Sequence, residues 1–509
     1  MSKKTESQND EPISSENRSD EKGTGRRLFL TGAAIAAAGV VTAVGPARIA
    51  AAAGMTASSA SGAASGVVAA PPGPKPPKQL TVNEKPISPL DPEFHYDRTP
   101  GADNTAAVQA AISKAMTAPG GEVSLPAGEI YVTALAVDYR NSPTQPVNGL
   151  PYGYAGPKIT GAGMRQTKII QIAGSTADIF TVCGQVDSNA GPANNNKATG
   201  VTIADLELTG TPGGGNGLYL RSLVNCEFRN IWMQKTGKSG IFRERATFVG
   251  GVNDEYSYAN SFNKIKIVSP GGWGVQDSGI ASIGGSMTNV EAISPGLGGF
   301  LLAPTNMTLL DCQAIGGTVG LRSVRNQTLR SVNSGLTLLN FRSEGSREGY
   351  EILVEAGISH MIVNPNFFPT SGAHCLGVGL GDENSDNYVR NLTVVGGYFG
   401  VISKFGDQKA MVLGPNSRNT RFVNPTIELG GGEAARTEES LISDGGYRTS
   451  FDLPGYTSMT PQGYTTQNRF ADSIPTPAAD QVNEGWEKNG STWQKVAVFP
   501  DGRRVVIAS

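Results

Sequence analysis

A recurring change of phase in the apolar alternation constrains this chain more than any other sequence feature. In "VTIADLEL" (201–208), Val201 and Ile203 alternate with polar residues, and the alternation changes phase across Asp205. Because side chains alternate between the two faces of a strand, a phase change indicates a bend from one strand into the next. The pattern recurs at "CEFRNIWM", "NKIKI", "MTNVEA", "MTLLDCQA" and "LTLLNFRS", and more weakly at "IVNPNF" and "FVNPTI", with corners at Asn230, Lys264, Asn289, Asp311, Asn340, Asn364 and Asn424.

The spacing of these corners predicts a solenoid. The first apolar residues after the first six corners follow one another at steps of 25, 34, 25, 22 and 29 residues. An irregular period of roughly 20 to 35 residues with strand chemistry is typical of a parallel β-helix, in which turns stack and insertions enter loops. Asn and Asp suit the corners because they tolerate left-handed backbone and bond the turn.

The segment before the repeat predicts a helix followed by two strands. "GADNTAAVQAAISKAM" places Val108, Ile112 and Met116 on one helical face, and "GGEVSLPAGEIYVT" is a strand, a Pro-Ala-Gly turn and a strand. With "ITGAGMRQTKII", this opening resembles the pectate-lyase-like superfamily of right-handed parallel β-helices. The resemblance implies an all-β solenoid with an N-terminal capping α-helix. Because that superfamily includes lyases, hydrolases, epimerases and phage tailspikes, it leaves the activity open.

The chain divides into four predicted parts. Residues 1–53 resemble a twin-arginine signal peptide, since Arg26 and Arg27 precede Phe29, Leu30 and a short Ala-rich run. Residues 54–91 are rich in Ala, Ser and Pro and predict a disordered linker. Residues 92–430 form the β-helix domain. Residues 431–509 lose the repeat and end in a hairpin at "WQKVAVFPDGRRVVIAS". The predicted location is secreted, by the twin-arginine pathway.

The charge balance excludes several classes of partner. The net charge of the chain is −2, and acidic and basic residues are mixed, so neither nucleic acid nor, after signal cleavage, a membrane is an expected partner. Four cysteines at Cys183, Cys226, Cys312 and Cys375 fit neither a disulfide scaffold nor a zinc motif. No cofactor motif is evident, and a calcium requirement stays open. A homotrimer stays open as well, because relatives of this kind include trimers.

Aligning the corners stacks the outward residues into a column that predicts a carbohydrate-binding face. The first outward positions hold Trp232, Lys266, Glu291, Gln313 and Arg342, below Glu207, and Glu344 occupies the second position beside Arg342. Successive turns lie about 4.8 Å apart, so these side chains form one polar stripe. An indole beside cations and carboxylates suits a sugar chain, with Trp232 and Gln313 as binding residues.

Two chemistries fit Lys266, Glu291, Arg342 and Glu344 as the catalytic set. Glu291 and Glu344 lie two turns apart and could act as acid and base in inverting hydrolysis, for which carboxyls stand about 6.5 to 9.5 Å apart. Alternatively, Lys266 and Arg342 could neutralise a uronate and abstract its α-proton in a β-elimination. The sequence thus predicts a polysaccharide lyase or glycoside hydrolase that cleaves an extracellular poly- or oligosaccharide. A non-catalytic, tailspike-like glycan-binding or structural protein is the alternative.

Further binding residues are predicted outside this column. The insertion at 242–262 contributes Asp254, Glu255 and Tyr256 as a groove wall. "PGGWGVQDSG" contributes Trp273 as a sugar platform and Asp277 as an acid. Arg347 and Glu351 follow the Gly345-Ser346 turn and are expected in a solvated loop or groove rim. The catalytic motifs of pectin hydrolases, alginate epimerases and the main pectate lyases are absent, so no catalytic residue is carried over from them.

Overall fold

The computed structural model describes most of the chain from residue 85 onward. The described residues are 85–117, 120–140, 153–184, 197–244, 257–278, 282–324, 334–347, 349–370, 372–381, 388–402, 407–430, 441–453, 456–460, 466–467, 469–471, 483–489, 492–499 and 501–508. The chain separates into two units, Met1–Thr81 and Val82–Ser509, and everything described below belongs to the second.

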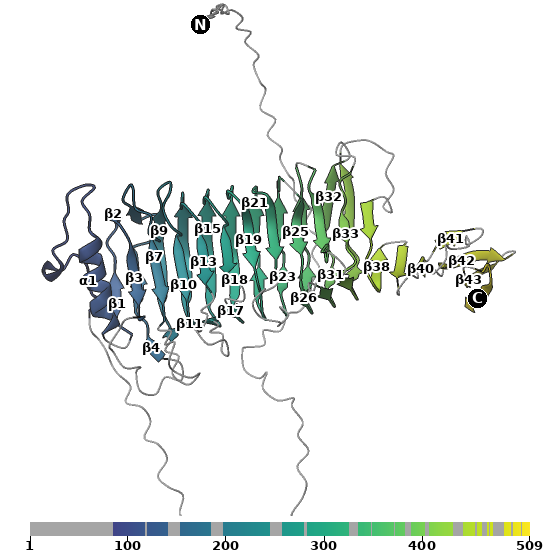
Figure 1. The fold of residues 1–509 in the computed structure, drawn as a ribbon, viewed down its shortest axis with the longest axis horizontal. Helices are drawn as coiled ribbons and strands as arrows, with labels where there is room; N and C mark the ends of the chain where they lie inside the picture. Colours follow the sequence, from purple (N-terminus) through teal and green to yellow (C-terminus); the bar gives the residue numbers. More distant parts are fainter. Residues whose placement is uncertain are drawn as a thin grey trace, which may run out of the picture. The chain divides into compact units, whose positions relative to one another are not determined.

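A helix opens the fold and covers the first turn of strands. After the short 3-10 helix η1 (Pro92–Phe94), α1 (Thr105–Met116) buries Ala107, Val108, Ala111, Ile112 and Ala115. The first residue of α1 is fixed by Asp103, whose carboxylate accepts a hydrogen bond from the Thr105 N–H at 2.9 Å. The buried face joins the same apolar cluster as the first strands, so α1 closes one end of the core (Figure 1).

The strands that follow belong to parallel sheets stacked turn upon turn (Figure 1). Sheet A, the 21-stranded sheet, bends at the corners. Its strands before the corner are β1 (Glu122–Ser124), β5 (Lys158–Thr160), β20 (Thr308–Leu310), β23 (Thr337–Leu339), β27 (Met361–Val363), β31 (Thr393–Val395), β35 (Arg421–Val423) and β38 (Thr449–Leu453). Those that continue through it are β9 (Thr202–Thr209), β12 (Glu227–Gln234), β15 (Ser261–Val268) and β18 (Ser286–Ile293). Those after it are β2 (Gly128–Val132), β6 (Thr167–Gln171), β21 (Gln313–Ile315), β24 (Arg342–Glu344), β28 (Asn366–Phe368), β32 (Tyr398–Ile402) and β36 (Thr426–Gly430).

Sheet B contributes one strand to every turn, in chain order. Its 11 strands are β3 (Leu135–Asp138), β7 (Phe180–Cys183), β10 (Leu218–Arg221), β13 (Ile241–Glu244), β16 (Val275–Ser278), β19 (Gly298–Leu302), β22 (Val319–Ser323), β25 (Tyr350–Val354), β29 (His374–Val378), β33 (Met411–Leu413) and β37 (Ile442–Asp444). Short strands complete the circuit: β4 (Gly153–Ala155), β8 (Lys197–Thr199), β11 (Leu223–Val224), β14 (Ser257–Tyr258), β17 (Ser282–Ile283), β26 (Gly357–Ile358), β30 (Val389–Arg390) and β34 (Ser417–Arg418).

Each predicted corner has left-handed backbone. Asp205, Asn230, Lys264, Asn289, Asp311, Asn340, Asn364 and Asn424 have φ between 48° and 60°. Several corner side chains also bond from turn to turn: the Asn340 amide donates to Asp311 at 3.0 Å, and the Asn364 amide donates to Asn340 at 2.9 Å. The apolar residue after each of the first six corners turns inward and is at most 1% exposed, as at Leu206 and Phe341. The corner therefore sets which side chains face the core.

The core is one continuous apolar column. It is built from inward residues of every turn and includes stacked rings, such as Phe228 and Phe262 at 5.1 Å between centroids. All four cysteines are buried and unpaired. Within the described ranges, no helix is both long enough and apolar enough to cross a bilayer.

The last strands depart from the parallel pattern. β39 (Tyr456–Thr460) pairs antiparallel with β38 and with β40 (Thr466–Gln467). A separate four-stranded sheet contains β41 (Arg469–Ala471), β42 (Asn483–Asn489), β43 (Thr492–Val498) and β44 (Arg504–Ala508). The antiparallel pairing of β43 with β44 is what a terminal hairpin requires.

Candidate functional site

The column predicted on sheet A exists in the predicted register. Trp232 pairs with Glu207 on one side and Lys266 on the other, and the series continues through Glu291 and Gln313 to Arg342. Glu344 pairs with Ile315 in the second outward position. The backbone placement of the four predicted catalytic residues on one face is therefore observed, whereas their catalytic role stays a prediction.

The contacts in this column are local pairs. Lys266 Nζ lies 3.1 Å from Glu291 Oε2, and it also lies 5.3 Å from the centroid of the Trp232 ring. The Arg165 guanidinium, from the loop before β6, lies 4.8 Å from the same ring. Cations from turns on either side thus contact the indole, and a sugar ring would have to displace one of them to stack on Trp232.

The second predicted pair is separate from the first. Arg342 donates to Glu344 at 2.6 Å and lies 5.2 Å from the Phe368 ring centroid. Among the described residues, no hydrogen bond or ion pair joins Glu291 to Glu344, since the turn of Gln313 lies between them. Ion pairs of this kind are also common on sheet faces that are exposed to solvent and have no catalytic role.

Trp273 and Asp277 do not lie on the outer face, which corrects their predicted contact with a ligand. Trp273 is 8% exposed and packs beside Gly298, where its ring would meet an added Cβ atom. Asp277 points into the solenoid from β16 and is 4% exposed. Its carboxylate accepts two hydrogen bonds from buried Arg243, at 2.6 and 2.9 Å, and one from the Ala303 N–H.

The remaining predicted binding residues have mixed outcomes. Asp254, Glu255 and Tyr256 lie outside the described residues. Arg347 is exposed, and its backbone N–H bonds the Gly317 carbonyl at 2.9 Å. Glu351, expected in a solvated loop, is instead 0% exposed, and the hydroxyls of Ser343 and Ser346 donate to its carboxyl at 2.5 and 2.6 Å. The inward-facing serines explain why a carboxyl can be buried there.

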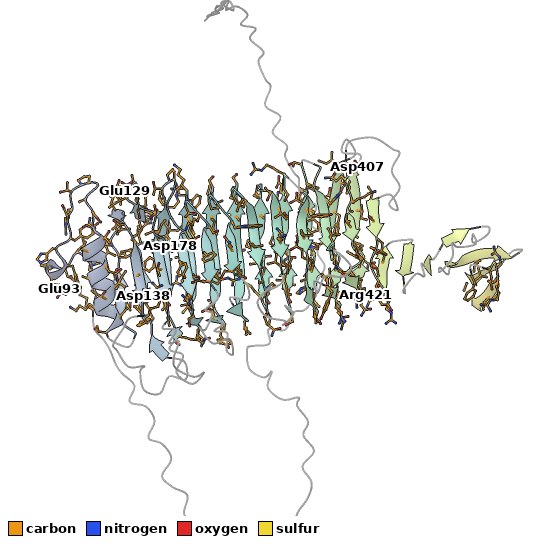
Figure 2. The ribbon with its side chains drawn as sticks, viewed as in Figure 1. Glu93, Glu129, Asp138, Asp178, Asp407 and Arg421 are labelled. Carbon is orange, nitrogen blue, oxygen red and sulfur yellow. The ribbon has the colours of Figure 1, made fainter. Side chains whose placement is uncertain are left out.

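Sheet B contains a second polar column, which the spacing of the corners does not predict. The last residues of its first four strands are in register: Asp138 with Cys183, Cys183 with Arg221, and Arg221 with Glu244. Their inward neighbours are buried, so this column faces outward. Arg140, two residues beyond Asp138, extends the cluster, and Asp178 precedes β7 on the same sheet (Figure 2). We call these six residues the sheet B cluster.

Glu244 is a carboxyl of this cluster whose surroundings raise its pKa. The Tyr219 hydroxyl donates to Glu244 Oε2, and Arg221 Nη1 lies 3.5 Å from the same oxygen. Burial raises the pKa of Glu244, the Arg140 guanidinium opposes this rise, and the negative charge of Asp178 adds to it. The net direction is upward, toward the behaviour of a general acid.

The pKa of Asp138 is shifted in the opposite direction, below its usual value. Burial alone would raise its pKa, but hydrogen bonds from the Arg140 side chain and backbone outweigh burial and lower it. The guanidinium bonds both carboxylate oxygens, with its shortest contact at 2.7 Å. Asp138 therefore stays ionised while Glu244 is biased toward its protonated form.

The surroundings of the two carboxyls are partly apolar. Tyr219 and Phe242 stack in the adjacent outward column, with centroids 5.8 Å apart. Cys183 is 0% exposed, and burial raises the pKa of its thiol to about 12, so the thiol is a neutral spacer between charged neighbours. Arg221 Nε is buried and has no hydrogen-bond partner among the residues that the structure describes. No group of His, Cys, Asp and Glu in the described ranges could hold a metal ion.

Comparison with known proteins identifies the fold. No family model and no curated protein sequence matches the chain. Among solved structures, it is similar to the A-module of the Azotobacter vinelandii mannuronan C-5 epimerase AlgE6, with a TM-score of 0.50 and 17% identity over 72% of this chain and 93% of that one. It is also similar to a doubly substituted tailspike protein of E. coli bacteriophage HK620 in complex with a pentasaccharide, with a TM-score of 0.50 and 14% identity over 72% and 65%. The chain has the parallel β-helix fold. The predicted fold class is thereby confirmed.

The sheet B cluster of this β-helix did leave a signal in the sequence. "LAVD", "FTVC", "LYLR" and "IFRE" all begin with an apolar residue, all but the last have an apolar third residue, and all but the second end in a charged residue. Aligning strand ends, in place of corners, would have stacked Asp138, Arg221 and Glu244. The corners do not predict them, because no residue within the strands of sheet B has the left-handed backbone that marks the register of sheet A.

Proposed function

We propose that the sheet B cluster is the active site of a secreted, carbohydrate-active enzyme that cleaves glycosidic bonds of an extracellular polysaccharide or oligosaccharide. The observation that carries this proposal is the pair of outward carboxyls, Asp138 and Glu244, whose pKa values are driven in opposite directions. Two carboxyls with such opposed environments are the usual acid and base of glycoside hydrolysis. The two similar structures are named for a mannuronan epimerase and for a tailspike with a bound pentasaccharide, which agrees with a carbohydrate substrate.

Glu244 and Asp138 take different roles in this mechanism. Protonated Glu244 donates its proton to the glycosidic oxygen as the bond to the anomeric carbon breaks. Ionised Asp138 accepts a proton from the water that attacks that carbon on the opposite face. The register places the two residues three strand spacings apart, about 14 Å between backbones. The Glu244 side chain reaches back toward Tyr219 on β10. In inverting enzymes the two carboxyls stand further apart than in retaining enzymes, because a water must fit between the base and the sugar. The separation of Asp138 and Glu244 therefore favours inversion over a covalent intermediate.

The neighbouring side chains position the substrate. The stacked rings of Tyr219 and Phe242 offer an apolar surface beside the carboxyls, where a sugar ring can lie. Arg140 and Arg221 fix Asp138 and Glu244 and donate hydrogen bonds to substrate oxygens. Elimination from a uronate remains the second chemistry, with Arg221 neutralising the sugar carboxylate and Tyr219 exchanging the proton.

The test compares variants on the two sheets. Mature protein is incubated with neutral and uronate-containing glycans while reducing ends and ultraviolet absorbance are recorded. Reducing ends alone indicate hydrolysis, and growing absorbance indicates elimination. We expect Glu244→Gln and Asp138→Asn each to lower kcat/KM by about 10²- to 10⁴-fold. Glu355→Gln is the control. Glu355 follows strand β25 of sheet B and is paired with an arginine in the same way, and we expect its replacement to leave activity unchanged.

The outcome also decides between the two columns. Glu291→Gln and Glu344→Gln retain activity if the sheet B cluster is the active site, and lose it if the sheet A prediction is right. Full activity of Glu244→Gln rejects the present proposal. Glycan binding without any turnover by the unsubstituted protein supports the non-catalytic alternative.

A further inference from the structure

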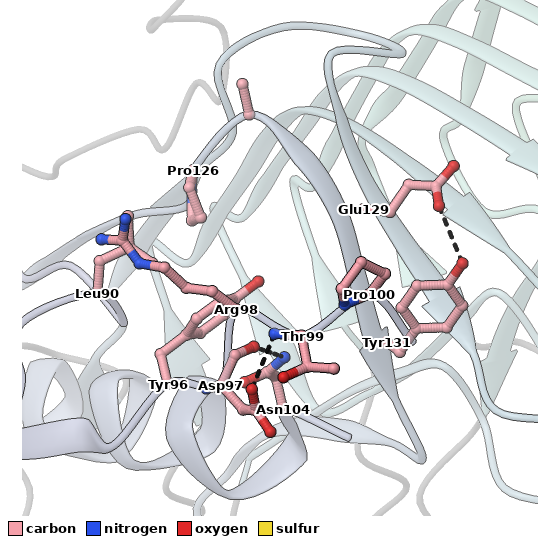
Figure 3. A pocket seen from close by; sticks show the side chains of 11 residues that line it. Leu90, Tyr96, Asp97, Arg98, Thr99, Pro100, Asn104, Pro126, Glu129 and Tyr131 are labelled. Atoms are coloured by element: carbon pink, nitrogen blue, oxygen red, sulfur yellow. Dashed lines mark hydrogen bonds between the residues drawn. The ribbon is translucent and has the colours of Figure 1, made fainter. Parts of the chain in front are cut away.

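A pocket of about 420 Å³ lies between the segment before α1 and strand β2, apart from the sheet B cluster (Figure 3). Its Glu129 belongs to the outward column of sheet A, since it is in register with Lys168, which is in register with Glu207. Tyr96 and Arg98 stand on one side of it and Glu129 and Tyr131 on the other, with Thr99 between them (Figure 3). Sites for small ligands commonly have volumes of about 300 to 1,000 Å³ and combine an apolar wall with a few polar groups. This pocket has the size and the composition of such a site.

The wall of the pocket is fixed without a ligand. Buried Asn104 accepts the Asp97 N–H at 2.8 Å and donates to the Asp97 carbonyl at 2.9 Å. Asp97 in turn accepts the Thr99 N–H at 2.8 Å. These bonds hold the loop that carries Arg98 against the start of α1, so little conformational entropy would be lost on binding.

The two charged side chains that face each other across the pocket differ in their partners. Glu129 accepts the Tyr131 hydroxyl at 2.9 Å and lies 3.7 Å from Lys168 Nζ. Arg98 has no hydrogen bond or ion pair with any residue that the structure describes. Its positive charge lowers the pKa of Tyr96, although burial of that phenol is the larger effect and raises it. The cation without a partner is therefore the group that remains available to a ligand.

We propose that this pocket binds a monosaccharide carboxylate, with the carboxylate on Arg98 and the ring between Tyr96 and Tyr131. A guanidinium matches a carboxylate with two parallel hydrogen bonds. The Thr99 hydroxyl and the oxygens of Glu129 can bond ring hydroxyls, which distinguishes a sugar acid from a purely apolar carboxylate. The proposal concerns a site separate from the sheet B cluster and stands whether or not that cluster cleaves glycans.

Titration calorimetry on the intact protein tests this with sodium glucuronate as the probe. We expect a dissociation constant on the order of 1 mM, since one charged contact and one ring wall contribute. Arg98→Gln weakens binding by about tenfold or more. Arg98→Lys keeps the charge but cannot donate two parallel hydrogen bonds to a carboxylate, and it has an intermediate effect. Arg421→Gln is the matched control, because it removes an exposed arginine at distant β35 (Figure 2), and it binds as the unsubstituted protein does.

Two other probes separate the parts of the proposal. Glucose, which has the ring without the charge, and acetate, which has the charge without the ring, each bind at least tenfold more weakly than glucuronate. Absence of glucuronate binding overturns the proposal, as does equal binding by Arg98→Gln with an unchanged melting temperature, or equal binding of glucose or acetate. Because no readout is catalytic, an inactive sheet B cluster would leave this result unaffected.

Discussion

At the scale of residues, the position of one arginine controls two carboxyls. Arg140 bonds Asp138 directly, and its charge also acts on Glu244. In both cases it favours the ionised form and so lowers the pKa. The same side chain thus sets both limits of the pH range in which one carboxyl is ionised and the other protonated.

Replacing Arg140 should therefore move the whole pH profile of activity. The base must be ionised, so activity falls as pH drops below the pKa of Asp138. The acid must be protonated, so activity falls as pH rises above the pKa of Glu244. Arg140→Met removes a lowering influence from both, and both limbs of kcat/KM against pH should shift upward. Arg322→Met, which removes a paired arginine elsewhere on sheet B, should leave both limbs in place; a shift of only one limb would contradict the shared control.

At the scale of elements, the corners predict the register of sheet A, whereas the register of sheet B follows only when the ends of its strands are aligned one by one. In sheet A a single residue of left-handed backbone, such as Asn340, interrupts the alternation and marks the register. In sheet B the strands begin and end in loops of different lengths, so Asp138 and Glu244 have no shared local marker. Asp277 was misplaced for a different reason: a buried polar residue with a buried partner looks, in sequence, like a polar residue facing water.

The buried pair formed by Arg243 and Asp277 provides a test at this scale. Asp277→Asn or Arg243→Met leaves one charge in the core without its partner, and each should lower the free energy of unfolding by about 3 to 5 kcal/mol. Combining Arg243→Met with Asp277→Asn removes both charges and should cost clearly less than the sum of the two single replacements. Urea unfolding of the variants measures the difference. Additive losses would show that the two side chains do not depend on each other.

At the scale of the whole molecule, each turn is stabilised by its neighbours, and an end turn has a neighbour on one side only. The structure meets this need at the first turn with α1, whose Val108 and Ile112 are 0% exposed. Leaving that apolar end and its strand edges open would expose a surface prone to self-association.

A charge on the inner face of α1 should therefore affect solubility more than fold. Ile112→Lys is expected to lift the helix from the first strands and to produce oligomers, measured by light scattering, while strand content by circular dichroism is largely kept. Ser113→Lys places the same residue on the exposed face of the helix and should remain as soluble as the unsubstituted protein. Equal behaviour of the two variants would mean that the helix does not protect this end.

The single-residue corner of sheet A has a consequence for how such a protein can acquire new specificity. The bend there admits no change in length, whereas the connections that flank sheet B range from the lone Ser222 to the stretch 139–152 between β3 and β4. Insertions and deletions can thus accumulate in the loops on both sides of sheet B while the register of sheet A is kept. Ligand choice and architectural integrity are in this way assigned to different stretches of the polypeptide, so that one can diverge without endangering the other.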